Sequence, residues 1–97
     1  MQYFLTEKII AMDYEVLLQE QALLFKAEFT LLPDEELINR FNKQVKCLGG
    51  NTIRKVYLAV LRDELRKRNF DCSLIIHKCG LRLHHKVKLQ NQRLVYA

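Results

Sequence analysis

The chain is 97 residues long, 49% hydrophobic and 28% charged, which is typical of one globular domain and excludes extensive disorder. The net charge is +5, and no apolar run reaches the length of about 18 residues that a membrane span needs. Segment 1–12 lacks the basic and apolar blocks of a secretory signal, and the cysteine number is odd. We therefore expect a cytoplasmic protein with reduced thiols.

The first segment, about 6–29, contains no Gly or Pro and predicts a long helix. Asp13 could cap a helix that starts there, and segment 1–12 either continues this helix or forms a separate piece. Apolar residues recur every three or four positions, so one face should enter the core. This face consists of Tyr14, Leu18, Ala22, Phe25 and Phe29.

A second helix is predicted over 34–48. It follows Pro33 and begins with three acidic residues, which suit the positive end of a helix dipole. Gly49-Gly50 are expected to end it in a left-handed conformation. Its predicted core stripe is Leu37, Ile38, Phe41, Val45 and Leu48.

A third helix is predicted over about 51–68, with Asn51 or Thr52 as the N-cap and Asn69 as a left-handed terminator. Its core face should be broad, and basic residues should gather on the opposite face. The predicted core face is Ile53, Val56, Tyr57, Val60, Leu61 and Leu65, and the basic face is Lys55, Arg62 and Arg66.

After Phe70 the apolar period changes to two, which predicts strands. A short strand is expected over 74–76, with a break at Cys79-Gly80. A longer strand is expected over 81–89, and a tight turn at Asn91-Gln92 should return the chain as strand 93–96. With that turn, the facing pairs are Leu89 with Leu94 and Val87 with Tyr96.

These elements predict a single α+β domain over 1–97. About three N-terminal helices should precede a small antiparallel sheet of two or three strands that ends in a C-terminal hairpin. The order of elements over 34–97 also resembles a winged-helix domain, although no motif of that family is present. A plain helical hairpin is the simpler interpretation of the two central helices.

The basic charge lies almost entirely in the second half of the chain. Residues 1–48 hold five basic and eight acidic residues, and residues 49–97 hold eleven and three, so the two halves carry −3 and +8. Such asymmetry suggests a surface for an anionic partner, although a solvated basic surface is the plain alternative. The candidate nucleic-acid-binding residues are Arg54, Lys55, Arg62, Arg66, Arg82, His84, Lys86, Lys88 and Arg93.

Within this set, the strongest candidate is the polar face of the strand predicted over 81–89, with Arg93 across the turn. Alternate residues on a strand lie about 6.6–6.8 Å apart, a pitch comparable to phosphate spacing along a nucleic-acid strand. Lysines that protect a sheet edge from aggregation are the alternative. In the helical pair, the polar start 51–55 offers further side chains that could contact bases and phosphates.

Cysteine and histidine cluster near the end of the chain, at Cys72, His77, Cys79, His84 and His85. These residue types bind zinc, but their spacing matches no common ligand pattern, so ordinary core cysteines and partly exposed histidines are the simpler interpretation. Cys79 with His77 or His84 could form a thiolate nucleophile, but no nearby carboxylate would orient the imidazole. We therefore predict neither a metal, nor a cofactor, nor an enzyme.

The first helix is apolar on more than one side, and a helix of that kind often packs against a second chain. We predict homodimerisation through it; a single core that covers every side is the alternative. The sequence thus predicts a non-catalytic binding module, either for nucleic acid or for protein assembly as a homodimer or accessory subunit. The residues behind the dimer prediction are Val16, Leu17, Leu18, Leu23, Leu24 and Phe25.

Overall fold

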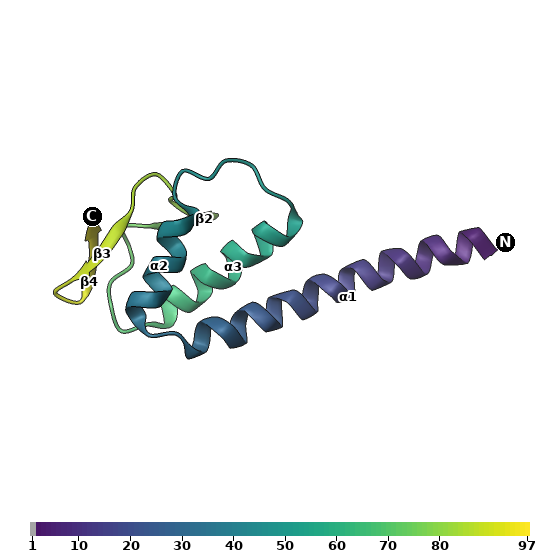
Figure 1. The fold of residues 1–97 in the computed structure, drawn as a ribbon, viewed down its shortest axis with the longest axis horizontal. Coiled ribbons are helices and arrows are strands. Elements are labelled where there is room, and N and C mark those ends of the chain that lie inside the picture. The colour runs from purple at the N-terminus through teal and green to yellow at the C-terminus, as the bar shows by residue number, and fades with distance from the viewer. Residues whose placement is uncertain (1) are drawn as a thin grey trace.

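The computed structural model describes residues 2–97, and their side chains from Tyr14 onward. Three helices precede two small antiparallel sheets, so the fold is α+β as predicted (Figure 1). Four short strands form two separate sheets instead of the single expected sheet, and the winged-helix alternative is not confirmed. The elements are α1 (Gln2–Leu31), α2 (Asp34–Gln44), α3 (Thr52–Lys67), β1 (Ile76–His77), β2 (Gly80–Leu81), β3 (Val87–Gln90) and β4 (Arg93–Tyr96).

Helix α1 is continuous, so Asp13 lies inside it and the prediction of a cap there is wrong. Its 30 residues span about 45 Å at 1.5 Å per residue, most of the 62 Å length of the molecule. Figure 1 shows its second half beside α3, whereas its first half runs past the end of α3. Tyr14 is consequently 48% exposed, while the rest of the predicted face is at least partly buried.

Aromatic rings join α1 to α3. Phe25 and Phe29 each meet the Tyr57 ring edge-on, with ring centroids 5.1 Å apart in both pairs. Edge-to-face contacts of this kind add to the free energy of burying the rings. The fully buried core draws on all three helices and on the strand region. It comprises Phe29, Leu37, Phe41, Leu61, Leu65, Ile75 and Val87.

Helix α2 ends at Gln44, earlier than predicted, and Gly49-Gly50 do not cap it. The chain leaves the helix through Lys46, whose φ of 62° is left-handed. The backbone N–H of Lys46 then donates to the carbonyl of Leu83 at 2.9 Å. A hydrogen bond to a distant segment thus replaces the next helical turn.

The earlier end of α2 removes Leu48 from the core. Its side chain is 96% exposed, so its predicted place in the core stripe is wrong. The other four residues of that stripe are buried or partly buried, as predicted. Gly49 and Gly50 still adopt positive φ, but within the loop that leads to α3.

Helix α3 begins as predicted, because the side chain of Asn51 accepts a 3.0 Å hydrogen bond from the backbone N–H of Arg54. All six predicted core residues are buried or partly buried. The helix ends at Lys67, and Arg68 follows in an extended conformation, with φ −76° and ψ 160°. Asn69 has no positive φ, so its expected role as a left-handed terminator is wrong.

The C-terminal hairpin has the predicted register, with Val87 opposite Tyr96 and Leu89 opposite Leu94. Asn91-Gln92 form its turn with φ of 54° and 64°, the two positive values that a type I′ turn requires. Strand pairing therefore aligns the apolar residues on one side of the hairpin.

The Asn42 side chain joins this hairpin to α2. It donates to the carbonyl of Val87 at 2.8 Å and accepts from the Val87 N–H at 2.9 Å. Both backbone groups of Val87 are satisfied in this way, which matters because its side chain is only 1% exposed.

The strand predicted over 81–89 is wrong as a single element, because residues 82–86 have no regular structure. The strand predicted over 74–76 is mostly a turn, and only Ile76 belongs to β1. The apolar residues of 81–89 are still buried or partly buried, and the polar residues that alternate with them are exposed. His85, which was predicted on the same face as the apolar residues, is exposed instead. The burial pattern of a strand therefore survives where its hydrogen bonding does not.

Arg68 joins the three helices. Its guanidinium donates to the carbonyl of Phe29 at 2.8 Å, to the carboxylate of Asp34 at 2.9 Å and to that of Glu64 at 3.1 Å. The Glu64 side chain is only 9% exposed, so Arg68 compensates a buried charge.

Candidate functional site

The nine basic residues predicted to bind nucleic acid fall into two groups. Arg54 and Arg62 are partly buried and hydrogen-bonded inside the protein. The other seven are exposed, and they come from α3, from segment 82–86 and from the C-terminal hairpin. The exposed group, here called the cationic surface, is Lys55, Arg66, Arg82, His84, Lys86, Lys88 and Arg93.

Arg54 holds the loop between α2 and α3. Its guanidinium donates to the carbonyl of Gly49 at 2.6 Å, to that of Cys47 at 3.0 Å and to the Gln44 side chain at 3.1 Å. Three guanidinium nitrogens are therefore engaged. The role of Arg54 is to fix this loop, and few of its donors remain to meet a ligand.

Arg62 holds the first hairpin against α3. Its guanidinium donates to the carbonyls of Gly80 and His77, at 3.2 Å each. These are the paired residues at the end of the β1–β2 hairpin. Like Arg54, Arg62 stabilises a loop that has few buried contacts of its own.

Lys88 and Arg93 lie together on the outward side of the C-terminal hairpin. Lys88 pairs with Val95 and Gln90 pairs with Arg93, so the two cations are diagonal neighbours. Diagonal neighbours on one side of a hairpin are about 7–8 Å apart. The register that buries Val87 on the inner side therefore places both charges in solvent.

Arg82, His84 and Lys86 are exposed but do not continue this strand. The backbone N–H of Arg82 donates to the carbonyl of Ile75 at 2.7 Å, whereas the carbonyl of Lys86 accepts from Ala97 at 2.9 Å. The chain passes from one hairpin to the other between these two bonds. The regular row of cations predicted along 82–88 is thus wrong, and the charges form an irregular group.

Few carboxylates oppose the cationic surface. Among the described side chains, the ion pairs are Arg40 with Glu28 and Arg68 with Asp34 and Glu64, none of which involves this surface. Asp71 forms a backbone bridge to Arg93 of the hairpin. Hydrogen bonds from Ser73, with a smaller contribution from the charge of Arg93, lower the pKa of the Asp71 carboxyl. The charge of Arg93 is therefore partly compensated by Asp71.

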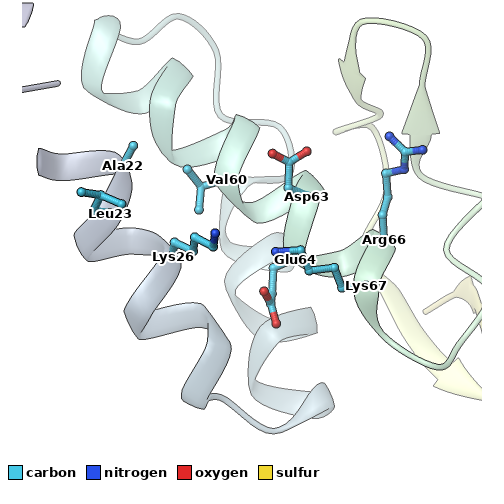
Figure 2. Close-up of a pocket in the computed structure, with 8 residues that line it drawn as sticks. All are labelled: Ala22, Leu23, Lys26, Val60, Asp63, Glu64, Arg66 and Lys67. Atoms are coloured by element: carbon cyan, nitrogen blue, oxygen red, sulfur yellow. The ribbon is translucent and has the colours of Figure 1, made fainter. Parts of the chain in front are cut away.

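A groove of about 400 Å³ lies between α1 and α3. Figure 2 shows Lys26 reaching from α1 toward α3, whereas Asp63 and Arg66 point away from α1. Charges of both signs line the groove beside apolar side chains, so it has no single electrostatic character. Its lining residues are Ala22, Leu23, Lys26, Val60, Asp63, Glu64, Arg66 and Lys67.

The cysteines and histidines do not form a cluster. No group of three or more metal-binding side chains is positioned to hold an ion in the part of the chain whose side chains are described. The backbone N–H of Cys79 donates to the ring of His77 at 3.3 Å within one turn. Cys72 is partly buried, and this burial raises the pKa of its thiol, while Cys47 and Cys79 are exposed.

A second surface lies on the exposed side of α1, and Leu23 at its edge also lines the groove. We call it the outer face, and its five large apolar side chains are 45–84% exposed. The sequence analysis includes four of these residues but not Leu31. Leu31 lies seven residues after Leu24, and this interval of about two helical turns could have placed it on the same side of the helix. The outer face consists of Val16, Leu17, Leu23, Leu24 and Leu31.

No family model, curated protein or solved structure matches this chain. Among the described residues, no helix has the length and apolarity of a membrane span.

Proposed function

We propose that this protein is a small non-catalytic binding module that contacts the phosphate backbone of nucleic acid through its cationic surface. The observation that carries the proposal is that seven basic side chains of the C-terminal half are exposed and take part in none of the ion pairs between described side chains. Cations left unpaired in solvent are available to phosphates, and counterion release on binding would supply the free energy.

The irregular arrangement of the charges favours contact with the backbone over reading of sequence. Segment 82–86 has no regular structure, and no helix or flat strand presents the whole group to a groove. Contacts from Lys and Arg to phosphates position a protein on nucleic acid without sequence information. We therefore expect weak sequence preference and a steep dependence on salt, with a log–log slope of about −0.9 per phosphate contact on duplex DNA.

Fluorescence anisotropy with labelled single-stranded and duplex DNA and RNA, at low and at physiological salt, tests this proposal. The test variant is Lys86→Glu/Lys88→Glu, which reverses two charges on the cationic surface. The matched control is Lys26→Glu/Lys43→Glu, which makes the same change in net charge at two exposed helical lysines.

We expect the test variant to weaken binding at least about tenfold, with a slope reduced by about two contacts, and the control to have a much smaller effect. Equal losses in the two variants would mean that net charge alone acts. Absence of binding by the wild type at low salt would overturn the proposal. Circular dichroism of each variant verifies that it folds.

An assembly role is the second candidate, because the outer face of α1 leaves large apolar side chains in solvent. Association through apolar surface persists at high salt, whereas phosphate binding does not. The salt series therefore separates the two functions.

A further inference from the structure

We infer that the outer face of α1 binds the same face of a second copy of this chain. This inference does not depend on nucleic-acid binding. It rests on the spacing of the outer-face residues, on their place in the fold and on the area that they offer.

The spacing of the outer face is that of a helix–helix seam. Leu17, Leu24 and Leu31 are separated by seven residues each, which is close to two helical turns, so their side chains form a row along α1. Val16 and Leu23 repeat the same interval about 100° around the helix from this row. A helix–helix seam has apolar residues at two positions of each heptad. Here the leucines hold one position, and Glu20 and Ala27 hold the position three residues later.

The place of this row in the fold makes it available. The opposite side of α1 is used for the core, where Phe25 and Phe29 pack on Tyr57 of α3. Leu23, Leu24 and Leu31 are nevertheless 66%, 62% and 84% exposed. In Figure 1 the side of α1 away from α3 has no other element against it. The row is therefore a second apolar face that the monomer does not cover.

The area is sufficient for a weak symmetric dimer. The five residues together expose about the surface of three complete side chains, and a buried Leu or Val removes roughly 60–120 Å² of apolar surface from water. Two copies thus contribute roughly 600 Å². Since interfaces are about 56–65% apolar, this corresponds to about 1,000 Å² in total, the lower limit for a specific interface.

A second copy fits the face because an apolar row is complementary to itself, as a two-fold interface requires. Two charged residues of 16–31 interrupt the row, Glu20 between Leu17 and Leu24 and Glu28 between Leu24 and Leu31. Glu28 is paired with Arg40, whereas Glu20 takes part in none of the ion pairs between described side chains. In a dimer two such carboxylates would lie near the seam, and their repulsion would limit the affinity. Replacing Glu20 with an apolar residue should therefore tighten the dimer.

Sedimentation velocity from about 1 to 200 µM, without nucleic acid, tests the inference. The expected mass rises with concentration from 11.6 kDa toward twice that value. Leu24→Glu should keep the protein monomeric at every concentration, and Glu20→Leu should lower the Kd at least about fivefold. Glu15→Leu is the control, because this exposed residue lies about 140° around the helix from Glu20.

A wild type and a Glu20→Leu variant that both stay monomeric would overturn the inference. It would also be overturned if Leu24→Glu dimerised as the wild type does, or if Glu15→Leu tightened the dimer as much as Glu20→Leu. All substituted side chains are exposed, so the variants should fold, and far-ultraviolet circular dichroism verifies this.

Discussion

Replacement of Arg68 tests how the three helices are held together. In Arg68→Ala, the Glu64 carboxylate, 9% exposed, loses its donor, and the carbonyl of Phe29 loses a 2.8 Å hydrogen bond. A hydrogen bond that involves a charged group contributes about 1.5–3 kcal/mol, and both of these bonds involve the charged guanidinium, so together they contribute at least about 3 kcal/mol. Asp34 is 43% exposed, so the solvent-screened pair with it adds less than about 1 kcal/mol.

We therefore expect Arg68→Ala to lower the free energy of unfolding by about 3 kcal/mol, a large part of the 5–15 kcal/mol typical of a domain. For a domain of this size the Tm should fall by about 12–24 °C. Urea and thermal unfolding, followed by circular dichroism, measure both quantities. Arg40→Ala is the control, because its pair with Glu28 is 30% and 44% exposed and should contribute less than about 1 kcal/mol.

A double-mutant cycle with Glu64→Gln separates the buried charge from the other contacts. If the uncompensated carboxylate causes most of the loss, Glu64→Gln should restore about 1 kcal/mol in the Arg68→Ala background, although it destabilises the wild type. Additive effects in this cycle, or a loss in Arg68→Ala no larger than in Arg40→Ala, would refute the reasoning.

Two further results are expected. Gln92→Gly should raise the free energy of unfolding by about 0.5–1 kcal/mol, because Gln92 has a φ of 64° and glycine adopts that conformation without strain. Thermal unfolding measures this change, and a lower Tm in the variant would contradict the prediction. Cys72 should react with iodoacetamide more slowly than exposed Cys47 and Cys79 near about pH 8, because burial raises the pKa of its thiol and less of it is thiolate. Mass spectrometry of the labelled peptides gives the order of reaction, and equal rates would be the contrary result.

Features that depend on neighbouring residues could be predicted from the sequence. The register of the C-terminal hairpin follows from a period of two and from Asn91-Gln92, whose turn leaves one pairing that aligns the apolar side chains. The start of α3 follows from Asn51, whose side chain accepts a hydrogen bond from the backbone N–H three residues later, at Arg54. The presence of apolar residues on more than one side of α1 could also be predicted, because a helical projection uses only the sequence of that helix.

Features that depend on distant residues were decided by the tertiary structure. Helix α2 ends early because the Lys46 N–H bonds to Leu83, and segment 82–86 bends because its two ends pair with different hairpins. In the candidate site, the sequence identified the cations but not their partners. Arg62 and Arg68 are both arginines of the basic half of the sequence. In the structure, Arg62 supports a hairpin, whereas Arg68 joins three helices.

The three helices, the terminal hairpin and the charge of each half could be predicted from the amino-acid sequence, whereas the first hairpin and the irregular segment 82–86 could not. The tertiary structure alone decided which cations remain free and which side of α1 stays uncovered. The physical reason is that turns, caps and periodicity act over a few residues, whereas a guanidinium can reach carbonyls 15 to 39 residues away in the chain. Such partners exist only after the chain has folded.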